Sequence, residues 1–249
     1  MSNNDFQSIR TELIKKTKSQ LADSVTEDII IMQTLATIDD LSLSLNNVAT
    51  RLREWAAYTV PELEHSVSNH ESFARFLVTK SYDEILSEFV KGQTMGARLS
   101  SEDYSALVSF ATKVLEMYEL RTSLTDYLES SLQKYTPNTL AICGPTIAAR
   151  LLSSAGSLRR LATIPASTIQ LYGAEKALFR HLRSGAKSPK YGHIFSHPLL
   201  QNAARSEAGK VARALADKIA MCAKLDYFKG DFLGDKYLIA LEVKFGGKK

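Results

Sequence analysis

Four cationic side chains recur at intervals of four, three and four residues in the second half of the chain: Lys176, Arg180, Arg183 and Lys187. An α-helix turns by about 100° per residue, so this spacing puts all four on one face. A row of cations spaced in this way can follow the phosphates of a nucleic-acid backbone. The spacing therefore predicts a helix that binds a polyanion.

A loop with aromatic and basic side chains follows this row. Lys190, Tyr191 and His193 stand among glycine and proline residues that favour a turn. RNA-binding proteins use such loops because rings and charges there can meet an unpaired base. We expect these three residues to contact RNA, with Lys210 and Arg213 extending the contact from the next helix. Packing beneath the loop for Tyr191 and a solvated position for Lys210 are the alternatives.

Motifs for catalysis or cofactor binding are not found. The segment 208–211 resembles the end of a phosphate-binding P-loop, but Ala204 replaces the first glycine and Val211 replaces the magnesium-binding hydroxyl. His193 and His197 are four residues apart, yet Pro198 follows and no third zinc ligand is close in sequence. There is also no dinucleotide-binding glycine motif, and no spacing pairs a nucleophile with a base. We therefore expect no enzyme activity, no cofactor and no metal.

Charge is distributed unevenly along the chain, whose formal net charge is +4. Residues 1–137 hold 13 Lys and Arg against 20 Asp and Glu, a formal charge of −7. Residues 138–230 hold 14 against 4, a charge of +10. A basic block of this size favours nucleic acid as the partner, and a solvated basic face without a partner is the alternative.

Composition favours long helices. The 249 residues include 12 Gly and 6 Pro, about two thirds and half of the average usage of roughly 7% and 5%. Cys143 and Cys222 are too few for a disulfide framework, so we expect both to be small buried hydrophobes. The polar N-terminal residues, with no apolar run of about 18, predict a soluble intracellular protein.

Apolar residues in the acidic half follow the alternating spacing of three and four that is typical of a coiled coil. Two stripes show it: Ile38, Leu41, Leu45, Val48, Leu52 and Trp55, and then Leu107, Phe110, Val114, Met117, Leu124 and Leu128, with Arg121 at one seam position. Pro61 ends the first helix, and Ser100 with Asp103 predicts a capping box at the start of the second. Between them we expect one helix from Phe73 to Phe89 and a turn over residues 91–96. An antiparallel hairpin within one chain covers both stripes, and a coiled coil between two chains is the alternative.

Pro137 marks the change from the acidic to the basic half. We therefore expect a lead-in at residues 1–35, a coiled-coil domain at 36–136, a basic helical domain at 137–232 and a C-terminal segment at 233–249. Helices are predicted from Gly144-Pro145 onward, over residues 167–183 and over roughly 199–224. Residues 234–243 fit a short helix or a strand.

Several segments carry the signature of a known family: Ala148–Leu151, Ala155–Leu158, Pro165–Gln170, Gly173–Leu182, Pro189–Gly192 and Gly209–Ala212 with Arg213. Arg53-Glu54-Trp55, Pro61-Glu62-Leu63 and Leu99–Asp103 add to it in the acidic half. In this order they resemble the Nop domain of archaeal box C/D ribonucleoprotein scaffold proteins, over about residues 40–230. Relatives of that domain are nucleolar and spliceosomal.

The resemblance implies an all-α fold, in which a long antiparallel coiled-coil hairpin precedes a globular helical Nop domain. It also implies recognition of a composite surface, made by a kink-turn RNA and its small kink-turn-binding protein. In the family, the loop that matches Lys190 and Tyr191 lies close to the RNA. Gly173, Ala174 and Glu175 are accordingly assigned to the protein partner.

The resemblance implies two further partners. The coiled coil mediates self-association in archaeal particles. Family scaffolds dock the methyltransferase fibrillarin through a domain that precedes the coiled coil, whereas residues 1–35 precede it here, which counts against fibrillarin.

The leading hypothesis is a non-enzymatic RNA-binding scaffold of a box C/D-like particle, cytoplasmic in an archaeon and nuclear or nucleolar in a eukaryote. A coiled-coil module that binds proteins, or a Nop-domain paralogue that assembles particles without fibrillarin, is the alternative. Departures from the family wording at Ala56 and Tyr191 motivate that alternative.

Overall fold

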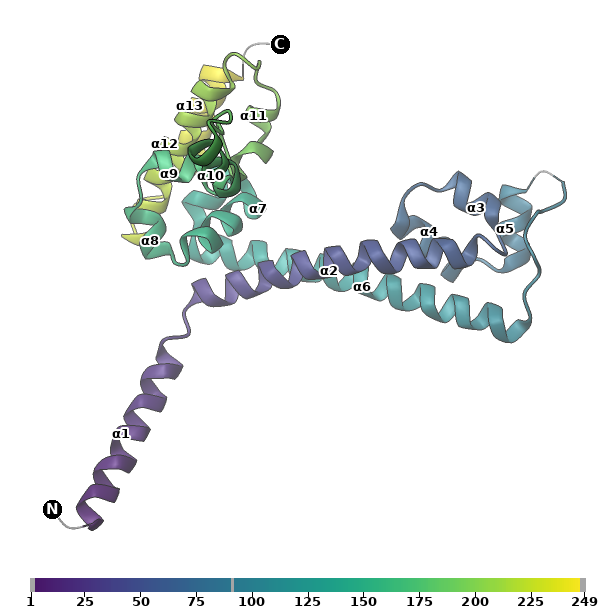
Figure 1. Cartoon of the computed structure of the whole chain (residues 1–249), viewed down its shortest axis with the longest axis horizontal. Coiled ribbons are helices and arrows are strands. Elements are labelled where there is room, and N and C mark those ends of the chain that lie inside the picture. The colour runs from purple at the N-terminus through teal and green to yellow at the C-terminus, as the bar shows by residue number, and fades with distance from the viewer. Residues whose placement is uncertain (1–2, 91, 247–249) are drawn as a thin grey trace. The chain divides into compact units, whose positions relative to one another are not determined.

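The computed structural model describes residues 3–90 and 92–246, which form helices joined by loops and contain no strand (Figure 1). The prediction of an all-α fold is confirmed. The chain divides into two compact units. Unit 1 combines the residues up to Leu35 with those from Leu128 onward, and unit 2 comprises Ala36–Tyr127.

Unit 2 is built on two long helices that run side by side in opposite directions, α2 (Glu27–Ala56) and α6 (Ser101–Tyr135) (Figure 1). Its core contains Leu45 and Leu52 from α2 and Leu107 and Val114 from α6, all buried. The two predicted stripes thus cover each other within one chain. Trp55 lies at the edge of the core, where its ring centroid is 6.2 Å from that of Phe110.

Three short helices complete unit 2: α3 (Pro61–Ser66), α4 (His70–Thr79) and α5 (Tyr82–Phe89). The prediction of one helix from Phe73 to Phe89 is wrong. Ser81 breaks it, because its hydroxyl accepts from the backbone N–H of Glu84 while the Glu84 carboxylate accepts from the backbone N–H of Ser81. This capping box satisfies the free N–H groups of a new helix start.

A guanidinium fixes α3 to the end of α2. Arg53 donates to the backbone carbonyls of Val67 and Glu64, each at 2.7 Å, and pairs with the Glu64 carboxylate at 3.1 Å. The same group lies 4.6 Å from the ring centroid of Phe73. Because this side chain is largely buried, the contacts are protected from water, unlike those of a surface ion pair.

The turn before α6 is held by close backbone approach. A Cβ on Gly96 would lie 1.9 Å from the carbonyl oxygen of Thr59, so no larger residue fits there. The Glu62 carboxylate accepts from the Thr94 hydroxyl and the Met95 N–H, each at 3.0 Å. Burial opposes ionisation of Glu62, but these hydrogen bonds lower its pKa. Lys91, which the sequence analysis assigned to this turn, lies outside the described residues.

Unit 1 is organised around α12 (Ala208–Tyr227), which packs against α7 (Pro137–Ala155), α8 (Leu158–Thr163) and α9 (Ala166–Leu171). The remaining elements of the unit are α1 (Asn3–Asp23), α10 (Glu175–Ser184), the 3-10 turn η1 (His193–Ser196), α11 (Pro198–Gln201) and α13 (Gly234–Phe245). Residues 234–243, which fitted either a helix or a strand, are helical. Gly144 takes a positive φ of 73° and produces the kink in α7 that precedes Pro145.

Two helix starts in unit 1 are capped by side chains from distant segments. The buried Asp226 carboxylate accepts from the backbone N–H and side chain of both Asn138 and Thr139, at 2.7–2.9 Å. The Asn138 side-chain oxygen in turn accepts from the N–H groups of Leu233 and Gly234. The end of α12 therefore fixes the first turn of α7, and α7 fixes the first turn of α13.

Two predicted helices of unit 1 are each divided. Residues 167–183 are split between α9 and α10, because Gly173 takes a φ of +88° that few other residues adopt. Residues 199–224 are split between α11 and α12, which leaves a turn over 202–207. No helix in the described part of the chain is long and apolar enough to cross a membrane.

Candidate nucleic-acid interface

Helix α10 presents three of the four predicted cations. Lys176, Arg180 and Arg183 are exposed, and none of the three has an ion-pair partner in the described part of the chain. The helix ends at Ser184, where Gly185 takes a left-handed conformation. The prediction that Lys187 continues the row on the same helix is therefore wrong, and Lys187 is an exposed residue of the following loop.

Two exposed apolar side chains lie beside the cationic row of α10. Phe179 and Leu182 are 61% and 70% exposed, and no residue of α10 is buried. They are three residues apart, so they lie next to each other on the helix surface. This helix thus carries a cationic row and an uncovered apolar pair, which suits simultaneous contact with a polyanion and a protein.

The segment before α10 is fixed by its own carboxylate. Glu175 accepts from the backbone N–H of Gly173 at 2.8 Å. Burial opposes ionisation, but backbone hydrogen bonds and the nearby His193 lower the pKa of Glu175. A Cβ on Gly173 would lie 2.5 Å from the His193 ring, so glycine is required by both φ and space. Glu175 consequently orders the loop that presents Gly173 and Ala174.

The loop after α10 is held against α9. The Gln170 side chain donates to the Lys190 carbonyl at 2.6 Å, and the Gly192 N–H donates to the Gln170 carbonyl at 2.9 Å. The ring of His181 bonds the carbonyl of Ala186. These bonds hold Lys190 and Tyr191 on an ordered loop, with the Lys190 side chain exposed.

These two loops border an open hollow of about 410 Å³. Its lining consists of Arg150, Gly173, Ala174, Tyr191, Gly192, His193, Phe195 and Ser196. The rings of Tyr191 and Phe195 are stacked, with centroids 4.9 Å apart and planes 7° from parallel. A stacked aromatic pair beside a guanidinium can receive the face of a base and a neighbouring phosphate.

The hollow brings together residues that were predicted to contact two different partners. Tyr191 and His193 were predicted RNA contacts, and Gly173 and Ala174 were predicted contacts of a protein partner. The His193 ring also bonds the Ser154 hydroxyl at 3.0 Å, so α7 helps to position it. Lys210 and Arg213 are exposed on α12 and do not line the hollow.

Two lining residues were missed by the sequence reasoning. Arg150 was noticed only as part of the Ala-Ala-Arg-Leu family segment. Phe195, which is nearly half exposed, lies four residues after Tyr191, and a 3-10 turn brings the two rings together. The sequence feature that could have identified Phe195 is its spacing from Tyr191, since aromatic residues in a basic segment are typical of RNA contacts.

His197, Cys143 and Cys222 occupy buried positions. His197 is buried and its ring bonds the Ile142 carbonyl at 3.0 Å, so it does not form a metal site with His193. The described residues contain no group of three His, Cys, Asp or Glu that could hold a metal ion. Cys143 and Cys222 are buried free thiols. Burial raises the pKa of both, to about 12 for Cys222, so neither is a reactive thiolate.

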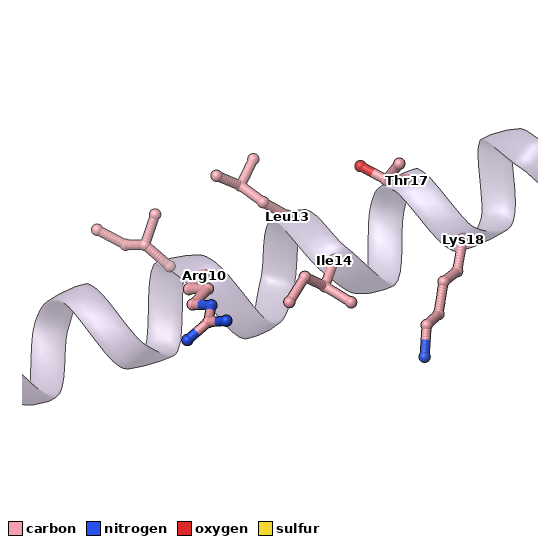
Figure 2. Close-up of a pocket in the computed structure, with 6 residues that line it drawn as sticks. Arg10, Leu13, Ile14, Thr17 and Lys18 are labelled. Carbon is pink, nitrogen blue, oxygen red and sulfur yellow. The ribbon is translucent and has the colours of Figure 1, made fainter.

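A second hollow, of about 380 Å³, lies on α1 (Figure 2). All six lining residues, among them Leu13 and Ile14, belong to this one helix. A single helix cannot enclose a ligand, and the lining offers apolar side chains with Arg10 and Lys18 at its edge. This surface is not a candidate for chemistry.

The family model for Nop, described as "snoRNA binding domain, fibrillarin", matches residues 37–245. The matched residues include both unit 2 and the helices of unit 1 that border the hollow lined by Tyr191 and Phe195.

The chain is also similar in sequence to several longer proteins. An uncharacterized NOP5 family protein of Methanocaldococcus jannaschii is 41% identical, covering 94% of this chain and 60% of that protein. Nucleolar protein 58 of Schizosaccharomyces pombe is 37% identical, covering 80% of this chain and 42% of that protein. The mouse nucleolar protein 58 is 36% identical, covering 82% and 41%. The chain thus spans less than two thirds of the length of these relatives.

The fold is similar to that of a solved structure. It is the crystal structure of a fibrillarin/Nop5p complex, with a TM-score of 0.59, 22% identity, and coverage of 100% of this chain and 81% of that chain. With the family model matched over most of the chain and relatives above 30% identity, this protein belongs to the Nop family.

Proposed function

We propose that this chain is a non-enzymatic RNA-binding scaffold of a box C/D-like ribonucleoprotein. It recognises a composite surface made by a kink-turn RNA and its primary binding protein, and family resemblance makes the particle a guide for 2′-O-methylation. The observation that supports it most directly is the pairing of the α10 cations with the aromatic hollow in one basic unit.

Each part of the proposed interface has its own task. Lys176, Arg180 and Arg183 hold phosphates, because their charges are exposed and have no ion-pair partner among the described residues. The stacked Tyr191 and Phe195 receive an unpaired base. Phe179 and Leu182, with the Gly173–Glu175 loop, contact the kink-turn-binding protein, since apolar side chains gain little from a phosphate backbone.

Gel-shift titration of a kink-turn RNA carrying its primary protein tests this assignment. The Lys176→Ala/Arg180→Ala/Lys190→Ala variant should bind at least about ten-fold more weakly, because two phosphate contacts and the charge of the Lys190 loop are lost. The matched control is Lys15→Ala/Lys16→Ala/Lys18→Ala on α1, which removes the same charge from exposed positions elsewhere. An equal loss in both variants would mean that net charge, and not this interface, determines binding.

A second candidate function is protein interaction through unit 2. Leu43 on α2 and Leu120 on α6 are exposed apolar residues of the long helices, and nothing in the described part of the chain covers them. We infer self-association through this surface. Sedimentation of the RNA-free full chain should show a dimer that Leu43→Glu/Leu120→Glu dissociates, and a monomeric wild type would exclude it.

We propose no contact for fibrillarin on these surfaces, and a pull-down with the chain bound to RNA and kink-turn protein would show whether fibrillarin binds elsewhere. We expect the scaffold to act in the cytoplasm of an archaeon, or in the nucleus or nucleolus of a eukaryote.

A further inference from the structure

Three aromatic residues at the end of α12 are partly or largely exposed. Phe228 is 73% exposed, Phe232 is 50% exposed, and Tyr227, the last residue of α12, is 37% exposed. The rings of Tyr227 and Phe228 meet edge to face, with centroids 5.0 Å apart. Three large aromatic side chains within six residues of a surface segment exceed what folding of unit 1 requires.

A hollow of about 560 Å³ lies beside Tyr227. Lys134 and Lys229 line it together with Tyr135 and Tyr227, and Lys224 is exposed on the last turns of α12. None of the three lysines has an ion-pair partner in the described part of the chain. The carboxylate in the lining, Asp226, accepts four hydrogen bonds from α7 and forms no ion pair with these lysines among the described residues.

Lys229 occupies a position that favours glycine. Its φ is +53°, and among the described residues it is the one non-glycine with a positive φ. The Gly230 N–H bonds the Leu225 carbonyl at 2.8 Å, which closes α12 in a Schellman motif whose left-handed residue is usually glycine. A lysine there costs about 1 kcal/mol. Its side chain nevertheless lines the hollow, which indicates that the charge has a use.

The solvent face of α12 links this end to the proposed interface. Lys210, Arg213, Lys224 and Phe228 fall on one exposed face, which Asp217 interrupts. At 1.5 Å per residue, Lys210 and Lys224 are about 21 Å apart, a distance that several nucleotides of a single strand can span. The cations thus continue past the predicted RNA contacts toward the aromatic end.

We infer that a single-stranded stretch of the bound RNA runs along α12 and stacks bases on Tyr227 and Phe228, while Lys134, Lys224 and Lys229 hold its phosphates. Aromatic faces among lysines are the combination that binds single strands without sequence preference. Continuity with Lys210 and Arg213 favours RNA over a protein ligand. This inference rests on the proposed function, because it takes the same RNA further across unit 1.

The experiment compares two forms of one RNA. A kink-turn RNA carrying its primary protein is titrated with the full chain by fluorescence anisotropy, with and without a uridine extension of about twelve nucleotides at either end. An extension at one end should raise the affinity at least about five-fold. Lys224→Ala/Phe228→Ala/Lys229→Ala should abolish that gain and leave the affinity for the unextended RNA unchanged.

Two single variants separate binding from folding. Lys229→Gly removes the charge and relieves the backbone, so it should reduce the gain while raising thermal stability. Lys236→Ala, an exposed lysine on α13 outside the hollow, should leave the gain intact. If neither extension raises the affinity, or the triple variant keeps the gain, the RNA assignment is overturned and the aromatic face is left for a protein.

Photo-crosslinking gives an independent readout. 4-Thiouridine in the extension should crosslink to peptides that contain Tyr227 or Phe228, and crosslinks that map only elsewhere would overturn the inference. Failure to bind the unextended complex would instead refute the proposed function. In that case, crosslinking of isolated oligouridine to the same peptides would still support the inference, and its absence would overturn it.

Discussion

Replacing Asp226 should destabilise unit 1 more than any change at an exposed residue of the same helix. Its carboxylate lies at the start of α7, where Thr136 gives no side-chain cap and Pro137 has no N–H. It accepts two backbone and two side-chain hydrogen bonds at 2.7–2.9 Å. Because all four donors are buried, none can turn to water when the carboxylate is removed.

The expected loss can be worked from these bonds. A missing helix cap costs about 1–2 kcal/mol, and buried donors left without an acceptor cost about 1–3 kcal/mol more. Asp226→Ala should therefore lower the free energy of unfolding by about 3 kcal/mol. Asp226→Asn keeps one acceptor oxygen but replaces the other with an NH₂ group, which cannot accept from the donors there. The free energy of unfolding should therefore fall by about 2 kcal/mol.

Urea unfolding followed by circular dichroism measures these losses, with Asp217→Ala as the matched control. Asp217 is exposed on the same helix and should change the free energy by no more than about 0.5 kcal/mol. Hydrogen exchange should also quicken at Leu233 and Gly234, whose N–H groups depend on Asn138. A loss below about 1 kcal/mol for Asp226→Ala would refute the assignment of this carboxylate as a cap.

Three further predictions concern single positions. Burial lowers the pKa of His197. Its Nδ1 accepts from the Leu199 N–H, and its Nε2–H donates to the Ile142 carbonyl. The contribution of His197 to stability is complete above the unfolded pKa of about 6.5 and is lost as pH falls from there toward the lower folded pKa, so His197→Gln should flatten the pH dependence of urea unfolding. An unchanged pH dependence in that variant would contradict this. Gly173→Ala should lower the free energy of unfolding by about 1–3 kcal/mol and weaken RNA binding. The control Gly209→Ala, where a Cβ meets nothing within 4 Å, should be neutral or stabilising. Arg53→Ala should lose about 2–3 kcal/mol in urea unfolding, and Arg51→Ala, whose pairing with Glu54 is exposed, less than about 0.5 kcal/mol; equal losses for the two arginines would show that burial of Arg53 is unimportant.

Spacing of apolar residues was sufficient to place the long helices. Leu45, Leu52, Leu107 and Val114 are buried at the predicted seam, because a stripe of that spacing can be covered only by another helix. Helix ends were less predictable. The break at Ser81 depends on a hydrogen bond to Glu84, and the same residue types occur inside many helices.

The candidate site was visible in the sequence as separate pieces. The cations of α10 follow from helical spacing, but Lys187 does not, because Gly185 ends the helix first. Stacking of Tyr191 on Phe195 and the approach of Arg150 to both loops depend on tertiary packing, which one-dimensional spacing does not encode. The long-range cap at Asp226 is hidden for the same reason, since 88 residues separate it from Asn138.

The salt dependence of RNA affinity tests the central claim most directly. For the kink-turn RNA bound by its primary protein, the logarithm of the binding constant should fall linearly with the logarithm of the salt concentration. Lys176→Ala/Arg180→Ala/Arg183→Ala removes three phosphate contacts and should reduce the magnitude of that slope by about 2–3. A slope identical to that of the wild type would show that these cations do not contact the RNA, and would contradict the account.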